Sequence, residues 1–265
     1  MTDAVLLCDI DPRGVATVSL NRPTVNNAYN AELIDALLAG FTALARDERV
    51  RVIVIRGNGL HFQAGADLKW LQQIGQQDAA ANLAVSTATA AAMRALNEIP
   101  KPTIALVHGF CVGGGTGIVA ASDIVIAERS ATFAISEARW GMAATIIFPQ
   151  LVAAIGIRQV RRYAQTCERF DAARAQALGL VHDLCEPGQL WNTATPVIEQ
   201  LLQAAPQAIA LSKQSAMATA GAFVTDDEFA RIVGEHAAKR QSAEAAEGLQ
   251  SFIEKRHAHW YPGTD

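Results

Sequence analysis

The sequence predicts an α/β fold with a helical C-terminal region, and three observations lead to this prediction. Short apolar runs alternate with helical patterns through the first half of the chain, which is typical of a mixed α/β core. The β-branched run VIVIR at 52–56 is apolar on both faces, which suits a strand covered on both sides. From Pro149 onward the patterns are almost entirely helical. With 265 residues, of which 51% are hydrophobic, the chain can form one large domain or one domain with a small appendage.

The first third reads as strand, strand, helix, strand. Val5 to Cys8 and Val15 to Leu20 are predicted strands, separated by the turn signal Asp-Pro-Arg-Gly. Asn30 is a predicted N-cap. The helix expected after it has apolar residues at i, i+3, i+4 spacing: Leu33, Ile34, Leu37, Leu38, Phe41 and Leu44.

The middle of the chain continues this alternation. A long Ala-rich helix is expected from about Asp78 to Glu98, and Pro100 and Pro102 follow it. GFCVGGGTG (109–117) is predicted to be a turn that leads into a helix near 116–121. Further strands are expected at 103–108, 124–127, 133–135 and 181–184, and helices at 189–203, 206–219, 226–240 and 243–258.

Composition and charge exclude several functions. The net charge is -4, so no basic excess indicates nucleic acid or an anionic membrane surface as a partner. No apolar segment reaches the ~18 residues that a membrane span needs. The four cysteines are far apart and accompany no histidine cluster, so no metal site is expected and buried free thiols in a reducing compartment are the simplest interpretation. We expect a cytoplasmic protein.

Two turns of the sequence could bring backbone N–H groups to a ligand. Gly109–Gly117 follows a predicted strand and opens a predicted helix, and its three consecutive glycines permit a close approach of the backbone. Phe62–Lys69 (FQAGADLK) does the same, with Asp67 placed at a helix start. Each turn alone could be tight packing only, but two such turns could direct two amides at one oxyanion. No phosphate-loop or dinucleotide spacing is present.

Glu137 is the candidate acid or base. It lies in FAISEARWG (133–141), among apolar residues. Partial desolvation there would raise the pKa of its carboxyl group and suit it to proton transfer. A helix-start or ion-paired glutamate is the alternative on composition alone.

Six segments together resemble the crotonase (enoyl-CoA hydratase/isomerase) family, in order and with the expected spacing. They cover nearly the whole chain: LNRPTVNNAYNAEL (20–33), HFQAGADLKW (61–70), KPTIALVHGFCVGGGTGIVAASDIVIA (101–127), FAISEARWGM (133–142), AxxLGLVH (175–182) and EGLQSFIEKR (247–256). The resemblance implies a crotonase-like ββα spiral core over residues 1–200. It also implies a helical C-terminal trimerisation region over 201–265 and assembly as a homotrimer or as a hexamer of two trimers.

The resemblance also implies a site. The amides of Ala66 and Gly114 would hold the thioester oxygen of an acyl-CoA, and Glu137 would move the proton. No cofactor is implied, since CoA is part of the substrate. The residues implied in substrate and CoA binding come from the same motifs and from the C-terminal helix: Thr24, Val25, Asn26, Ala64, Asp67, Leu68, Lys69, Gly113, Arg139, Trp140, Phe252 and Lys255.

One departure from the family's pattern bears on the reaction. Ordinary enoyl-CoA hydratases carry a second glutamate two residues after the GGG run, where this chain has Gly117. GGGxG, SEARWG and RRYxxTxERFDAAxAxxLGLVH (161–182) are similar to hydratases of branched glutaconyl-CoA thioesters. Met142, Ala143 and Ala144 are flexible or small residues, which favours a long acyl tail. This points to isohexenylglutaconyl-CoA of acyclic terpene breakdown before 3-methylglutaconyl-CoA of leucine breakdown. Arg139 is a possible partner of the second carboxylate.

Two other functions stay open at this point. An enoyl-CoA isomerase could use Glu137 alone to shift a double bond without adding water. A non-catalytic protein that binds CoA or a partner could keep the fold, although Glu137 and both glycine-containing turns are retained.

Overall fold

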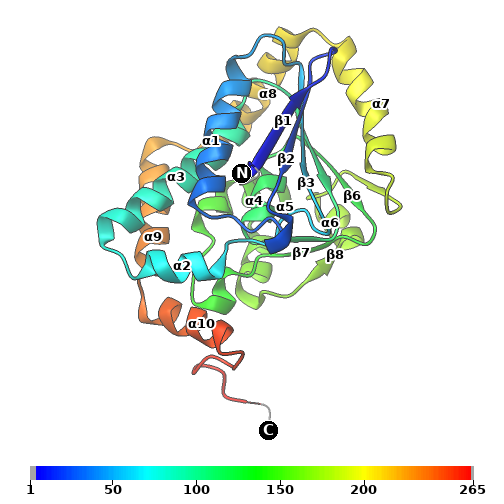
Figure 1. Ribbon diagram of the computed structural model, residues 1–265. Helices are drawn as coiled ribbons and strands as arrows, with labels where there is room; N and C mark the ends of the chain where they lie inside the picture. Colours follow the sequence, from blue (N-terminus) through cyan, green and yellow to red (C-terminus); the bar gives the residue numbers. More distant parts are fainter. Residues whose placement is uncertain (1–3, 264–265) are drawn as a thin grey trace.

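Two β-sheets and the helices around them form the protein (Figure 1), for which a computed structural model describes residues 4–263. The larger sheet has six strands in the order β1-β2-β3-β4-β6-β9, and only the β1–β2 pair is antiparallel. The smaller sheet has the order β5-β7-β8. The strands are β1 (Leu6–Ile10), β2 (Val15–Leu20), β3 (Val52–Gly57), β4 (Thr103–Val107), β5 (Phe110–Val112), β6 (Ile124–Glu128), β7 (Thr132–Ala134), β8 (Phe170–Asp171) and β9 (Asp183–Cys185).

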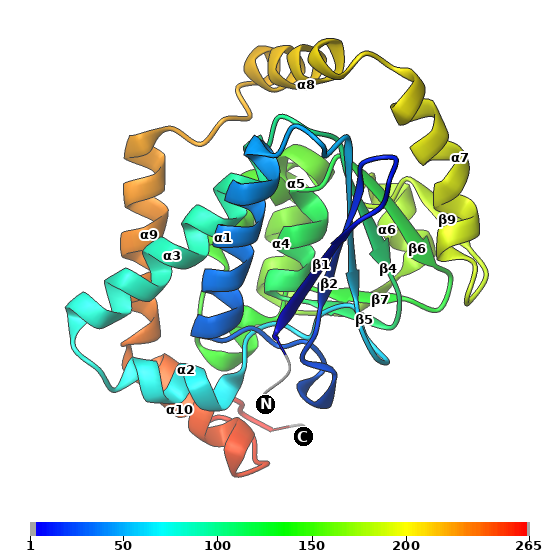
Figure 2. The same cartoon turned by 45° about the horizontal axis from the view of Figure 1, so that its top comes forward.

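The larger sheet is buried on both faces, as the VIVIR run predicts. Successive side chains of a strand point to opposite faces. In β3, Ile53 and Ile55 therefore join the main core under the helices, whereas Val52 and Val54 join a second core. That second core is closed by helix α7 (Leu190–Gln203). Figure 2 shows α7 on one side of the sheet and most other helices on the opposite side.

Four helices cover the main core: α1 (Ala31–Arg46), α3 (Ala79–Glu98), α4 (Gly114–Ala120) and α5 (Phe148–Thr166). The predicted N-cap Asn30 is confirmed, because its side chain accepts from the Leu33 N–H. Asp78 caps α3 in the same way, because its side chain accepts from the Ala81 N–H. Two short helices complete this part, α2 (Leu68–Gly75) and α6 (Ala172–Leu178).

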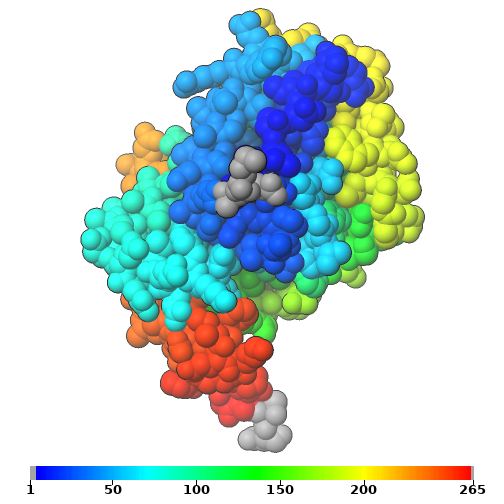
Figure 3. All heavy atoms as spheres, in the orientation of Figure 1, coloured from blue at the N-terminus to red at the C-terminus, as the bar shows by residue number. Residues whose placement is uncertain are grey.

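The C-terminal helices fold back over the same chain. They are α8 (Pro206–Ala220), α9 (Asp226–Arg240) and α10 (Ala243–Ile253). Helix α8 has no buried residue. Helix α9 packs beside α3, and α10 packs beside α2 and a short 3-10 turn, η2 (Glu137–Trp140). In Figure 3 the C-terminal segment, in red, projects from the body of the molecule.

Several local expectations are corrected. Phe110–Val112, expected to be part of a turn, is strand β5, and α4 begins at Gly114 rather than near 116. The final helix ends at Ile253 instead of reaching 258. Cys8, expected to be buried, is exposed on β1. Within residues 4–263, no helix is both long enough and apolar enough to cross a bilayer.

Candidate active site

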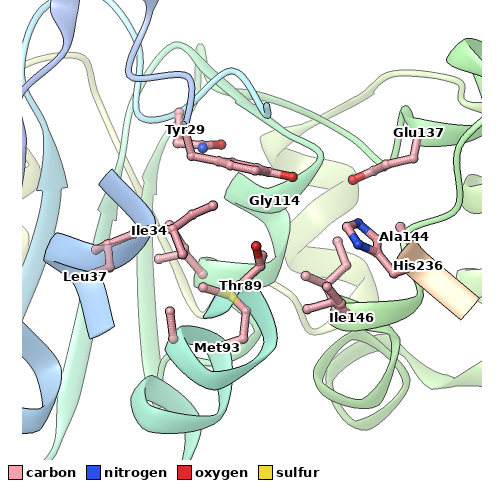
Figure 4. A pocket seen from close by; sticks show the side chains of 14 residues that line it. Tyr29, Ile34, Leu37, Thr89, Met93, Gly114, Glu137, Ala144, Ile146 and His236 are labelled. Atoms are coloured by element: carbon pink, nitrogen blue, oxygen red, sulfur yellow. The ribbon is translucent and has the colours of Figure 1, made fainter. Parts of the chain in front are cut away.

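A largely apolar cavity lies where α1, α3, α4, α9 and η2 meet, and Glu137 is in its wall (Figure 4). Four other polar side chains line it, those of Tyr29, Gln63, Thr89 and His236. The remaining lining residues are Ile34, Leu37, Ala92, Met93, Gly114, Ile118, Ala144, Ile146 and Ile147. The cavity therefore combines an apolar interior with a few convergent polar groups, as small-molecule sites usually do.

Two buried amide side chains hold the loop that precedes α2. Asn27 Nδ2 donates to the carbonyls of Asn58 and His61 at 2.9 Å and to that of Phe62 at 3.2 Å. Gln63 brackets Gly65, because its Nε2 donates to the Gly65 carbonyl and its Oε1 accepts from the Gly65 N–H. These bonds fix the backbone of the Ala-Gly-Ala-Asp turn before any ligand arrives.

The two amides predicted from the motifs are free to bind a ligand. Tyr29 N–H donates to the Gly65 carbonyl, and Asp67 N–H donates to the Tyr29 carbonyl. Since neighbouring peptide groups of an extended chain point in opposite directions, the N–H of Ala66 points away from Tyr29. Gly114 is the first residue of α4, where an N–H has no partner inside the helix. Among the described residues, neither amide has an acceptor.

Glycines bring these turns together. A Cβ atom at Gly113 would lie 3.5 Å from Gly65 Cα and 3.0 Å from Glu137 Oε1. Gly113 also has a backbone φ angle of 55°, which residues other than glycine rarely adopt. Its N–H donates to the Ala134 carbonyl at 2.9 Å, which ties the turn to β7. The structure thus places Ala66, Gly113, Gly114 and Glu137 in one neighbourhood.

The Glu137 carboxyl group is poised for proton transfer. Its Oε2 atom is buried and has no hydrogen-bond partner among residues 4–263. Burial raises its pKa to about 7, although the backbone N–H groups of Glu137 and Ser136 oppose the shift. A carboxyl group that titrates near neutral pH can act both as a base and, once protonated, as an acid.

Tyr29 and His236 are site residues that the sequence analysis missed. The Tyr29 hydroxyl points across the cavity toward Glu137, and the His236 ring lines the same cavity (Figure 4). Burial and the nearby Glu137 charge both raise the pKa of Tyr29, so its hydroxyl stays protonated. Tyr29 lies inside the motif that carries the family resemblance, but its residue type gave no signal. A single histidine in a helical pattern gave none either.

The packing around Gly117 leaves no room for the second glutamate that ordinary enoyl-CoA hydratases carry at this position. Gly117 is buried in α4, and a Cβ atom there would lie 2.3 Å from Cγ2 of Ile147. The space that a second glutamate would need is therefore filled by an isoleucine from η3 (Thr145–Ile147). Glu137 is the one carboxylate lining this cavity within the described part of the chain.

This packing predicts a stability effect. Gly117→Ala should lower the free energy of unfolding by about 1–3 kcal/mol, because the added methyl group overlaps Ile147. In the double variant with Ile147→Ala, we expect a loss at least about 0.5 kcal/mol smaller than the sum of the single losses. Urea denaturation measures both values.

Gly234→Ala is the matched control. It also adds a methyl group inside a helix, but at a position where the new atom meets nothing within 4 Å. It should stabilise the protein by up to about 1 kcal/mol through helix propensity. Equal effects of the two alanines, or strict additivity of Gly117→Ala and Ile147→Ala, would contradict the packing explanation.

The candidate CoA-binding residues lie outside the cavity, near its entrance loops. Thr24, Val25 and Asn26 are exposed, and the Asn26 carbonyl accepts from the Ala64 N–H at 3.0 Å, which joins the two loops. Asp67 caps α2 and pairs with Arg22 at 3.4 Å. Leu68 is half-buried at the start of the same helix, and Lys69 is exposed.

The remaining candidates lie on another face. Trp140 and Phe252 form an edge-to-face pair with centroids 4.9 Å apart, so α10 contacts η2 of its own chain. Lys255 is exposed just beyond α10. Arg139 is exposed and lines a separate groove with Trp140, Trp260 and other residues. The structure does not bring Arg139 into the cavity of Glu137.

A second, apolar groove adjoins the cavity. The two share Glu137 and Ala144 as lining residues. The groove continues along Met142, Ala143 and the apolar residues of α5: Phe148, Val152, Ile157, Val160 and Ala164. Arg161 and Gln165 of the same helix also line it. Glu137 thus lies between a cavity that contains polar groups and a groove that is mostly apolar.

The chain is similar to known proteins along nearly its whole length. The model of the enoyl-CoA hydratase/isomerase family matches residues 11–262. A Thermus thermophilus protein provisionally named enoyl-CoA hydratase is 31% identical over 94% of this chain and 98% of its own. An enoyl-CoA hydratase structure from Shewanella pealeana is 36% identical, with a TM-score of 0.78 over 97% and 96% of the two chains. One from Mycobacterium avium subsp. paratuberculosis is 25% identical, with a TM-score of 0.85 over 97% and 99%.

Proposed function

Because the chain belongs to the enoyl-CoA hydratase/isomerase family, we propose that it adds water to the double bond of a branched glutaconyl-CoA thioester. The observation that carries this proposal is the position of Glu137 between two spaces of different character. A branched β-carbon has two arms besides the bond to the α-carbon, and two spaces beside the catalytic carboxylate would accommodate them.

The proposed chemistry uses the groups already in place. Glu137 holds a water molecule and takes its proton as the oxygen adds to the β-carbon. Negative charge then develops on the thioester oxygen, where the N–H groups of Ala66 and Gly114 stabilise it. The proton returns to the α-carbon from Glu137 or from solvent. Only one carboxylate takes part, in keeping with the packing of Ile147 against Gly117.

Isohexenylglutaconyl-CoA is the proposed substrate, ahead of 3-methylglutaconyl-CoA. The groove along Met142, Ala143, Val152 and Ile157 supports a long apolar tail, because these walls are apolar and two of them are small or flexible. The test is a panel of isohexenylglutaconyl-, 3-methylglutaconyl- and crotonyl-CoA with product masses recorded. Hydration of the methyl-branched thioester alone would contradict the proposed tail.

Double-bond isomerisation is the second candidate, since a single carboxylate suffices for it. Glu137 would remove a proton at one carbon and return it at another. The product would then have the same mass as the substrate, whereas hydration adds one water.

The activity should depend on pH through Glu137. The carboxylate form is the base, so kcat/KM for hydration should decrease as the pH falls below about 7, approaching tenfold per pH unit. A pH–rate profile measures the midpoint. A midpoint near 4.5, the ordinary value of a glutamate, or a rate that rises on acidification, would contradict the role of a desolvated base.

We also propose that residues 201–265 take part in assembly as a trimer or a pair of trimers. Helix α8 buries none of its residues, and Leu211 on it is 64% exposed. Phe252, Trp260 and Tyr261 are exposed near the C-terminus as well. Light scattering of the purified protein should give the mass of three or six chains, and a monomer would contradict the assignment.

A further inference from the structure

Arg240 is a buried cation that has no carboxylate partner among the residues that the structure describes. Its residue surface is 3% exposed, and the guanidinium group lies between α9 and α3. Nη2 donates to Ser86 Oγ at 2.6 Å and to His236 Nδ1 at 2.9 Å, and Nη1 reaches Asn82 Oδ1 at 3.5 Å. Nε has no partner, and within residues 4–263 Arg240 forms no ion pair with a carboxylate. A buried charge left without a counter-ion is costly, so the site favours an anion supplied from outside the chain.

His236 connects this charge to the cavity. Its Nδ1 faces two donors, Arg240 Nη2 and Ser86 Oγ, the latter at 2.9 Å. An arginine can only donate, so Nδ1 must accept and the ring proton must be on Nε2. Burial and the Arg240 charge lower the pKa of His236 to about 3, so the ring stays neutral. The ring lines the same cavity as Glu137, and its Nε2–H has no acceptor in the described part of the chain.

The charge of Arg240 reaches the cavity through His236. Arg240 Nη2 donates to His236 Nδ1, whereas no hydrogen bond joins Arg240 to Glu137 within residues 4–263. The Arg240 charge also opposes the rise in the pKa of Tyr29, although the Glu137 charge has the larger effect on that group. The wall formed by His236 is therefore the side of the cavity on which Arg240 acts.

We propose that His236, positioned and polarised by Arg240, binds the distal carboxylate of a dicarboxylic acyl-CoA. This inference rests on the proposed function and assigns one arm of the substrate to this side of the cavity. In a glutaconyl thioester the second carboxylate is one methylene group away from the β-carbon. Its partner must therefore line a space that Glu137 also lines. His236 does so in the cavity and Arg161 in the adjoining groove, whereas Arg139 lines neither. We assign His236 because the groove is otherwise mostly apolar and suits the tail. The bound carboxylate would also supply the counter-ion that Arg240 lacks.

Binding of a matched ligand pair tests the assignment without requiring turnover. Glutaryl-CoA and butyryl-CoA differ only in the terminal carboxylate. Wild-type protein should bind glutaryl-CoA about 10- to 100-fold more tightly, the value expected of a charge-assisted hydrogen bond. In Arg240→Met this preference should be lost. His236→Gln, which keeps a donor near the position of Nε2, should retain part of the preference, whereas His236→Phe should lose it.

Arg231→Met is the matched control. It removes the same charge from the same helix, but from an exposed side chain that pairs with Glu228 and Glu235, so the preference should persist. Circular dichroism and the thermal midpoint of each variant verify folding, and we expect Arg240→Met to fold because it removes an uncompensated buried charge. Equal binding of the two ligands by wild type, or a preference that survives both Arg240→Met and His236→Phe, would overturn the inference. If the preference follows Arg240 but no glutaconyl thioester is hydrated, the proposed function fails and the carboxylate site remains.

Discussion

Glu137→Gln should reduce kcat/KM for the hydrated thioester by about 10²–10⁴-fold, the range that a general base contributes. Glutamine keeps the shape of the side chain but cannot accept the proton of the attacking water. The carboxyl group lies in the cavity wall and not with the CoA-binding candidates on the entrance loops, so the affinity for the CoA thioester should change little. Single-turnover kinetics and ligand titration measure the two quantities separately. Retained activity would remove Glu137 from the mechanism.

The same substitution, which lowers activity, should increase the stability of the protein at alkaline pH. The pKa of Glu137 is raised from 4.5 to about 7, so the folded state binds this proton more tightly than the unfolded state. Its contribution to the free energy of unfolding is therefore most favourable below pH 4.5 and is lost as the pH rises through 7. The total loss is about 3 kcal/mol, since each pH unit between the two pKa values changes the free energy by about 1.4 kcal/mol. Glutamine is neutral at every pH. Glu137→Gln should thus be more stable than wild type at pH 8, with a difference that shrinks toward pH 5; a pH-independent difference would mean that the carboxyl group is not desolvated.

Removing the N–H of Ala66 should reduce kcat/KM by about 10²–10³-fold, the usual loss for one donor to an oxyanion. A side-chain substitution cannot make this change, because the donor belongs to the backbone. Replacement of Ala66 by lactic acid converts the amide to an ester and keeps the methyl group. This N–H has no acceptor within residues 4–263, but the Gly65 carbonyl, which accepts from Tyr29 N–H and Gln63 Nε2, becomes the weaker acceptor of an ester. We therefore expect the protein to fold with a loss of about 1 kcal/mol.

An ester at Ala81 is the control for that experiment. The N–H of Ala81 donates to Asp78 Oδ1 at 2.8 Å at the start of α3, remote in sequence from the two turns. The same chemical edit there should weaken the helix cap by about 1 kcal/mol and leave kcat/KM unchanged. Similar losses of activity from both esters would indicate a general effect of the edit and would contradict the assigned role of Ala66.

The sequence predicted the parts of the site that are local. The Ala-Gly-Ala-Asp and Gly-Gly-Gly turns and Glu137 each lie in a short motif, and backbone donors follow from turn chemistry at a helix start. Strand VIVIR was predicted correctly because its apolar residues on both faces reflect the two cores that cover it. Phe110–Val112 was missed as a strand because three residues before a run of glycines show no period.

The rest of the site depends on tertiary packing. His236 lines the cavity, with Arg240 behind it, only because α9 folds back beside α3, a contact between segments about 150 residues apart. The α9 pattern reveals an amphipathic helix, not the residue that its buried face meets. Likewise, the sequence shows that Gly117 lacks a carboxylate, but only the structure shows Ile147 in its place.

Turnover of a branched glutaconyl-CoA thioester in ¹⁸O-labelled water, with mass spectrometry of the product, tests the central claim most directly. One carboxylate and two backbone N–H groups are proposed to add water at the β-carbon. The account predicts a product heavier than the substrate by one labelled water, formed by wild type and not by Glu137→Gln. A product with the mass of the substrate would contradict hydration and assign the cavity to double-bond isomerisation.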